Sequence, residues 1–282
     1  MRLRGIRRSS NVERRGRGGG GGRRVGGKGG LGIVGVLAVL AIGYFTGIDV
    51  SPLLQGGSVQ TEQRSTAQVE NPEMADFSAR VLATTEDVWG KIFPEQVGRP
   101  YTPPTLVIFD GVTRSPCGNA NGATGPFYCP ADGKAYLDTE FFTALDRQMG
   151  AGGDFAAAYV IAHEVAHHVQ NELGILSQVY AARQSSSQVE ANRLTVRLEL
   201  MADCLSGIWA ANVQGLMERG DLEEALNAAR KIGDDHLQRQ AGRVPQPHTF
   251  THGTSEQRAS WFQRGFDSGQ VRSCDTFAAA QL

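Results

Sequence analysis

The longest apolar stretch of the chain is LGIVGVLAVLAIGYFTGI at residues 31–48, a run of eighteen residues without a charged side chain. This length lies at the short end of what a helix needs to cross a bilayer, so the run predicts one transmembrane helix. A buried core helix and a cleaved signal peptide are the alternatives. The long basic stretch before the run and the lack of an Ala-x-Ala-like site after it argue against cleavage.

Helical periodicity dominates the rest of the pattern. Apolar residues recur at helical spacing from Phe77 to Ile92, which predicts an amphipathic helix. Further helices are predicted at residues 139–149, 154–173, 187–213, 221–232 and 254–266. Two short apolar runs, TLVIF at 105–109 and KAYLD at 134–138, predict strands. We therefore expect an α+β fold that is mostly helical, has a small β-sheet and is preceded by one transmembrane helix.

Charge is segregated along the chain, although the formal net charge is only −1. Residues 1–30 carry nine Arg and one Lys against one Glu, so the remaining residues carry −10. Because this stretch is rich in Gly and Arg and poor in large apolar residues, we expect a disordered basic tail. Nucleic-acid binding by the tail is the alternative reading of its charge, and no nucleic-acid partner is expected.

The positive-inside rule places residues 1–30 in the cytoplasm and the rest of the chain on the outer side of the cytoplasmic membrane, periplasmic or extracellular. Residues 31–48 then anchor the chain as a single-pass segment in contact with membrane lipid. Residues 49–73 are polar and lack aromatic side chains, which indicates a linker. The folded domain is expected to cover residues 74–282.

Four cysteines follow the apolar run, at positions 117, 129, 204 and 274. An even number in an oxidising compartment predicts two disulfides. Sequence alone allows three connectivities. Cys117 and Cys129 bracket a Gly-rich stretch, so we pair them, which leaves Cys204 with Cys274. A zinc site made of these cysteines is disfavoured because CxxC spacing is absent.

The sequence His163-Glu164-Val165-Ala166-His167 is an HExxH motif within a predicted helix. Residues four apart lie on one helix face, about 40° of rotation from each other, so the two imidazoles can share one metal ion. Glu164 occupies the adjoining sector, where its carboxylate can act on a water molecule without binding the metal. The motif therefore predicts a catalytic zinc site.

A catalytic zinc ion needs a third protein ligand in addition to a water molecule. Glu199 is the candidate, because it lies in an apolar stretch of the next long predicted helix. Asp203 follows one turn later on the same face, where it can accept the free N–H of a ligand histidine and fix the orientation of that ring. Glu190 is the alternative third ligand.

The stretches HEVAHHVQ and ELMADC resemble the glutamate-zincin group of metallopeptidases, in which a Glu of an ExxxD motif completes HExxH. More narrowly, the chain is similar to a bacterial family described as putative neutral zinc metallopeptidases. The resemblance is carried by CGNANGATGPFYCPADGKAYLD, AYVIAHEVAHHVQ, RLELMADCLSGIWA and THGTSEQRASWFQRGF. It implies a membrane-anchored, zincin-like domain that binds one Zn²⁺ through His163, His167 and Glu199.

The resemblance implies an endopeptidase that hydrolyses peptide or protein substrates outside the cytoplasmic membrane. Zinc activates a water molecule, and Glu164 takes its proton as general base and passes it to the leaving amine. The alternative is a non-catalytic envelope module that keeps zinc for structure and binds a partner. Retention of Glu164 argues against it, since a structural site needs no base.

Other candidates rest on analogy with related zincins. His252 and Arg258 have the spacing of a pair that faces the substrate carbonyl, so His252 is expected to stabilise the oxyanion and Arg258 to position it or a neighbouring carboxylate. A helix cap and a structural salt bridge are the alternatives. Tyr128 is a further donor candidate, and His168 is expected to be structural. The strand at residues 134–138 is expected to border the cleft and to pair with an extended substrate.

Overall fold

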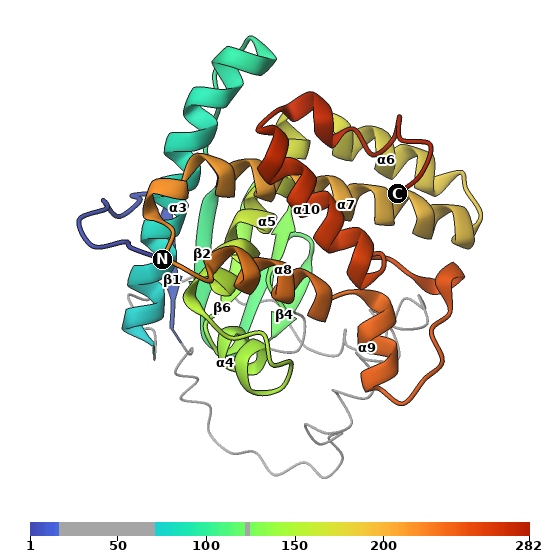
Figure 1. Cartoon of the computed structure of the whole chain (residues 1–282), viewed down its shortest axis with the longest axis horizontal. Coiled ribbons are helices and arrows are strands. Elements are labelled where there is room, and N and C mark those ends of the chain that lie inside the picture. Colours follow the sequence, from blue (N-terminus) through green and yellow to red (C-terminus); the bar gives the residue numbers. More distant parts are fainter. Residues whose placement is uncertain (17–70, 122–124) are drawn as a thin grey trace, which may run out of the picture.

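The computed structural model describes residues 1–16, 71–121 and 125–282 (Figure 1). Its described strands are β1 (Val12–Arg15), β2 (Thr105–Phe109), β3 (Val112–Ser115), β4 (Gly118–Asn121), β5 (Phe127–Cys129) and β6 (Lys134–Asp138). The α-helices are α3 (Pro72–Ile92), α4 (Glu140–Arg147), α5 (Asp154–Glu172), α6 (Ile175–Gln184), α7 (Gln188–Asn212), α8 (Asp221–Lys231), α9 (Asp234–Gln240) and α10 (Ser255–Ser268). The predicted α+β class is confirmed, and α6 and α9 are helices that the sequence pattern did not predict.

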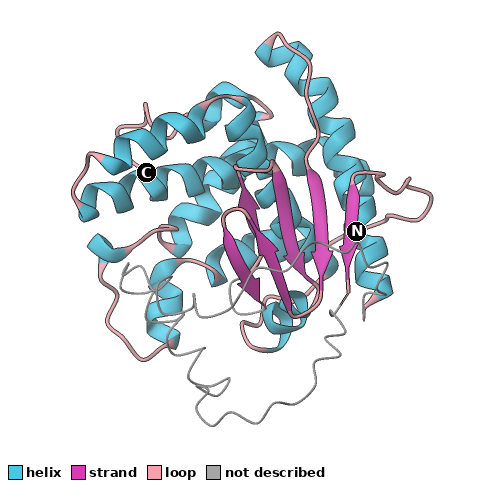
Figure 2. Ribbon diagram, turned by 180° about the vertical axis from the view of Figure 1, so that it is seen from behind, coloured by secondary structure: helices cyan, strands magenta, loops and turns pink. Residues whose placement is uncertain are grey.

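A four-stranded sheet in the order β1-β2-β6-β5 forms the β layer (Figure 2). Strands β1, β2 and β6 are parallel, whereas β5 is antiparallel to β6. Strands β3 and β4 form a separate antiparallel hairpin. Because β6 has partners on both sides, the prediction that residues 134–138 pair with a substrate is wrong. Among the described strands, β5 is the sheet edge on that side.

The two faces of the sheet bury different side chains, because successive residues of a strand point to opposite faces. Leu106, Ile108 and Leu137 belong to the main core, where helices α3 and α5 contact the sheet. Val107 and Tyr136 belong to a smaller cluster on the other face. The face of the sheet that contacts α3 and α5 is therefore apolar.

Helix α5 carries the HExxH motif through the centre of the helical layer. It contacts the sheet strands β5 and β6 as well as helices α3, α7 and α8. Its stretch Phe155–Ala162 is buried on all sides, which explains why the sequence there is apolar and Ala-rich rather than amphipathic. The part of α5 that precedes His163 is therefore fixed by packing on every side.

Helices α7 and α10 cross in backbone contact at two glycines. A Cβ atom on Gly207 would lie 2.0 Å from the carbonyl oxygen of Phe262, and one on Gly265 would lie 1.8 Å from the carbonyl oxygen of Cys204. The disulfide Cys204–Cys274 connects α7 to the segment that follows α10. The predicted second disulfide, Cys117–Cys129, joins the β3–β4 hairpin to β5, so both predicted pairings are confirmed.

The prediction of a disordered tail at residues 1–30 is wrong for residues 1–16. Strand β1 pairs in parallel with β2, from Val12 opposite Leu106 to Arg15 opposite Phe109. The α-amino group of Met1 lies 2.7 Å from a carboxylate oxygen of Asp154, at the start of α5. Sequence composition gave no sign of this order, because the segment gains its partners only from the folded domain.

The predicted membrane segment, residues 31–48, lies outside the described residues, as do residues 17–30 and most of the predicted linker. Helix α3 begins at Pro72, slightly earlier than the domain boundary expected at residue 74. Within the described ranges no helix is long and apolar enough to cross a membrane.

The close crossing of α7 and α10 generates a stability prediction. Gly265→Ala places a methyl group against the backbone of Cys204, so we expect it to lower the free energy of unfolding by about 3 kcal/mol. Gly90→Ala in α3 is the control, because no atom lies within 4 Å of the position that its Cβ would occupy and alanine favours a helix. Urea unfolding of both variants measures the effect, and equal midpoints would contradict the backbone contact.

Candidate metal centre

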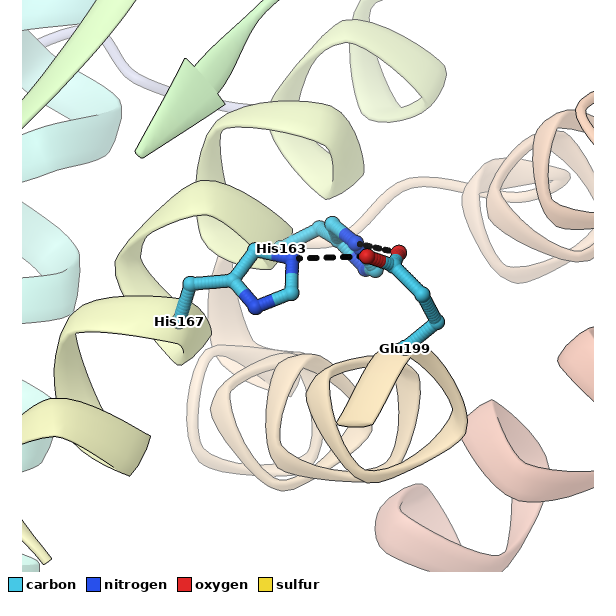
Figure 3. A group of neighbouring side chains, drawn as sticks. All are labelled: His163, His167 and Glu199. Atoms are coloured by element: carbon cyan, nitrogen blue, oxygen red, sulfur yellow. Dashed lines mark hydrogen bonds and ion pairs between the residues drawn. The ribbon is translucent and has the colours of Figure 1, made fainter. Parts of the chain in front are cut away.

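Three predicted ligands come together at the crossing of α5 and α7. His163 and His167 lie on successive turns of α5, and Glu199 reaches them from α7 (Figure 3). The two imidazole rings are perpendicular, with centroids 4.8 Å apart. All three residues offer ligand atoms within 4.8 Å of one another. The structure thus assembles a His₂Glu donor set from residues 36 positions apart in the sequence.

The spacing of these donors suits a tetrahedral zinc ion. Nε2 of His163 lies 3.1 Å from Oε2 of Glu199, and Nε2 of His167 lies 3.5 Å from Oε1. Two atoms that each lie about 2.1 Å from a tetrahedral metal ion are about 3.4 Å apart. Both imidazoles therefore direct the same ring nitrogen toward one carboxylate at the separation that a shared zinc ion requires.

A buried carboxylate supports the first ligand from behind. Oδ1 of Asp203 lies 2.9 Å from Nδ1 of His163, although this contact falls outside the angles of a hydrogen bond. The Tyr159 hydroxyl donates to the same carboxylate oxygen at 2.6 Å. The contact holds the ring with Nε2 toward Glu199, which is the orientation expected when a carboxylate supports a ligand histidine.

Arg258 completes this buried network. Its Nε and Nη2 atoms donate to the two oxygens of Asp203 at 2.9 and 3.0 Å, and its side chain is almost wholly buried. Of the roles expected for Arg258, positioning the oxyanion is therefore not the one that this geometry shows. The guanidinium instead pairs with a neighbouring carboxylate, because α10 packs behind α7 at this level.

Gln170 orients the ring of the second histidine, His167, as Asp203 orients that of His163. Its Oε1 lies 2.9 Å from Nδ1 of His167, and its Nε2 donates to the carbonyl oxygen of Leu198 at 2.6 Å. A fully buried side chain thus fixes the His167 ring and links α5 to α7 beside Glu199. The sequence analysis missed Gln170, although its position three residues after His167 placed it within reach.

The charges around the site favour a bound cation. Burial by itself raises the pKa of the Glu199 carboxyl, but the neighbouring imidazoles outweigh this and hold its pKa well below the ordinary value. Burial lowers the pKa of His163, yet Asp203 and Glu199 reverse the effect and raise it to about 9. Two carboxylates thus create a negative potential at the histidine nitrogens, which stabilises positive charge there.

Glu164 differs from these carboxylates in its surroundings. Burial raises the pKa of its carboxyl above the ordinary value, and the two neighbouring histidines only partly offset this. A carboxylate with a raised pKa accepts a proton more readily, which is the property that a general base needs. The local electrostatics therefore distinguish the predicted base from the predicted ligand.

His252 lies in the loop before α10, close enough for its charge to lower the pKa of Glu199. Its Nδ1 lies 3.3 Å from Oδ1 of Asp234. The other oxygen of Asp234 accepts the backbone N–H groups of Thr251, His252 and Gly253 at 2.6–3.0 Å. Asp234, which the sequence analysis missed, thus fixes both the loop and the histidine ring beside the ligand set.

Three other candidates lie away from the ligands. The Tyr128 hydroxyl lies 3.0 Å from Nδ1 of His168, whose Nε2 donates to the carbonyl oxygen of Thr102 at 2.6 Å. His168 is therefore structural, as predicted, and Tyr128 is its partner. Glu190 is exposed in the first turn of α7 and pairs with Arg193, so it does not replace Glu199 as the third ligand.

The buried Asp203–Arg258 pair yields a stability prediction. Arg258→Leu leaves the carboxylate buried without its main counter-charge, so we expect a loss of about 3–5 kcal/mol in the free energy of unfolding. Arg193→Leu removes an exposed cation from the pair with Glu190 and is expected to change stability by less than about 0.5 kcal/mol. Denaturant titration compares the two; a similar small loss for both would refute the network.

Gln170 yields a prediction about metal affinity. Gln170→Met keeps the side-chain volume but removes the acceptor for His167, so we expect zinc affinity to fall about 10- to 100-fold. Gln178→Met, in the exposed turn of α6, is the matched control and should leave zinc affinity unchanged. Competition with a chromogenic chelator measures both constants. Unaltered affinity in Gln170→Met would show that the hydrogen bond does not orient the ligand.

Comparisons with known proteins agree with this geometry. The sequence profile of the family described as "Putative neutral zinc metallopeptidase" matches residues 1–277. "Uncharacterized protein YpfJ" of Escherichia coli (strain K12) is 50% identical over 288 aligned residues, which cover 98% of this chain and 99% of that protein. "Uncharacterized protein Rv2575" of Mycobacterium tuberculosis (strain ATCC 25618 / H37Rv) is 40% identical over 219 residues, 72% of this chain and 71% of that protein.

No solved structure matches the chain significantly. The profile match includes residues 1–16, which is consistent with their place in the folded sheet. It also includes the HExxH helix and Glu199. The chain belongs to the putative neutral zinc metallopeptidase family.

Proposed function

We propose that the chain is a zinc-dependent endopeptidase that hydrolyses peptide bonds on the outer side of the cytoplasmic membrane. The observation that carries this proposal is the pairing of a His₂Glu ligand set with Glu164, a carboxyl whose pKa is raised by burial. A site that holds zinc only for structure uses four protein ligands and no adjacent base. Three ligands with a base beside them suit catalysis.

His163, His167 and Glu199 would hold one zinc ion. When bound, zinc lowers the pKa of water toward about 7 and polarises a carbonyl group. The Glu164 carboxylate accepts the proton of the attacking water and delivers it to the nitrogen of the departing amine. His252, held through Nδ1 by Asp234, is suited to stabilise the negative charge that develops on the carbonyl oxygen.

Strand β5 offers a place for an extended substrate. Its only sheet partner among the described strands is β6, so its outer edge is available for backbone hydrogen bonds. It contacts α5, the helix that carries His163 and His167. Strand addition at this edge gives affinity through main-chain atoms with little sequence preference, which suits a protease that acts on unfolded segments.

The two disulfides support the proposed compartment. Cys204–Cys274 is buried and ties α7, the helix of Glu199, to the chain beyond α10. Cys117–Cys129 fastens β5, the proposed substrate edge. Such bonds form and persist in oxidising environments, and they are rare in the cytosol. Both connect elements that shape the site, which favours function outside the cytoplasm.

A non-catalytic zinc module of the envelope is the competing function, and Glu164 separates the two. Glu164→Gln removes the base but touches none of the three ligands. We expect this variant to retain about one zinc ion per chain, measured by plasma mass spectrometry, and to lose about 10²- to 10⁴-fold in the rate of casein hydrolysis. Glu199→Ala is the companion variant and should lose the metal as well as the activity.

Full activity in Glu164→Gln would contradict its role as base. Wild-type protein that binds zinc through Glu199 but hydrolyses no protein or peptide would support the binding module instead.

A further inference from the structure

Residues 1–16 are part of the same folded body as the metal centre. Besides the β1–β2 pairing, the backbone N–H of Ser9 donates to the carbonyl oxygen of Ala79 in α3, and that of Arg2 donates to the carbonyl oxygen of Leu216. The side chains of Met1 and Leu3 are buried in the main core. These contacts involve backbone and core atoms at several points of the domain, so they define a docked segment rather than a loose tail.

Two basic residues of this segment, Arg7 and Arg8, are paired with acidic residues of the body. Arg7 lies 2.8 Å from Glu86 and 2.6 Å from Asp87, both in α3. Arg8 pairs with Asp76 in the same helix. In the opposite sense, Glu13 accepts from Lys134 of β6 at 2.9 Å. The segregation of positive charge before residue 31 and negative charge after it is therefore, in part, complementarity between two docked surfaces.

The described residues on either side of the gap between residues 16 and 71 lie at one end of the sheet. Arg15 ends β1 opposite Phe109, the last residue of β2. The carbonyl oxygen of Phe109 accepts the backbone N–H of Thr139, just after β6. Asn71, which caps α3, lines the same surface hollow as Thr139. Both flanks of the intervening segment thus lie at the carboxyl ends of the parallel strands.

We propose that residues 1–16 and the metal centre lie on the same side of the membrane, and not on opposite sides of a single crossing by residues 31–48. A single crossing by these residues would separate β1 from β2 and Arg7 from α3, which the folded domain holds together. Eighteen residues suffice for about one crossing of the hydrocarbon core and not for two.

This inference replaces the single-pass arrangement expected from the positive-inside rule, with residues 1–30 in the cytoplasm and the catalytic domain outside. That rule treats lysine and arginine before a membrane segment as free charges. Here Arg7 and Arg8 are bound to carboxylates of the domain, so they do not act as an independent cytoplasmic signal once the domain has folded. The inference does not depend on the proposed peptidase activity.

Cysteine accessibility in intact bacteria tests the proposal. Arg4→Cys and Val244→Cys place single thiols at exposed positions of the docked segment and of the body. Cells that express each full-length variant are treated with a membrane-impermeant maleimide before or after permeabilisation, and labelled peptides are identified by mass spectrometry. We expect both thiols to react in the same sample. Reaction of Val244→Cys in intact cells with Arg4→Cys protected until permeabilisation would overturn the proposal.

Two labelling results would support the same-side arrangement, and they have different meanings for the proposed function. Labelling of both sites in intact cells supports the same-side arrangement and a metal centre on the outer side. Labelling of both sites only after permeabilisation also supports the same-side arrangement, but it contradicts the outer location in the proposed function. A failure of one proposal is therefore distinguishable from a failure of the other.

A cross-link in the same cells verifies that the segment is docked on its own domain. In the Arg7→Cys/Asp87→Cys double variant, a short bifunctional maleimide should join the two positions, whose native side chains are 2.6 Å apart. Either single variant is the control and should give no such linked peptide. Absence of the linked peptide in a folded, labelled double variant would overturn the docked arrangement.

Discussion

The candidate site depends on the contacts that the buried carboxylate of Asp203 makes. It contacts His163 and Tyr159 from α5 and Arg258 from α10, while it belongs itself to α7. A charge in the interior is costly unless it is paired, so these helices have one favourable arrangement around it. That arrangement places Glu199, one turn before Asp203, opposite the two histidines. The same helix packing thus pairs the buried charge and brings the ligand set together.

Close backbone packing makes this arrangement possible. Gly207 and Gly265 let α7 and α10 approach until a side chain on either would collide with the other helix. At that separation the guanidinium of Arg258 donates to both oxygens of Asp203. The Cys204–Cys274 disulfide lies beside the same crossing and limits its opening. Small residues, a buried ion pair and a disulfide thus act on one contact between two helices.

The sheet imposes a second constraint, on the course of the whole chain. Strand β1 covers the edge of β2, and its neighbouring arginines pair with the acidic side of α3. Strand β1 is then the outermost described strand on that side, and a short, charged edge strand resists pairing with other chains. The result ties residues 1–16 to the body that carries the candidate metal centre.

The sequence by itself determined the chemistry and the local elements: HExxH on a helix, a glutamate and an aspartate one turn apart on the next long helix, and the pairing of the nearby Cys117 and Cys129. These are properties of short-range spacing, which helical geometry converts directly into shared faces. Only the tertiary structure decided the place of residues 1–16, the burial of Arg258 behind Asp203, and the parts of Gln170 and Asp234. Their partners come from distant segments, and no local pattern encodes which side chains meet when helices and strands pack.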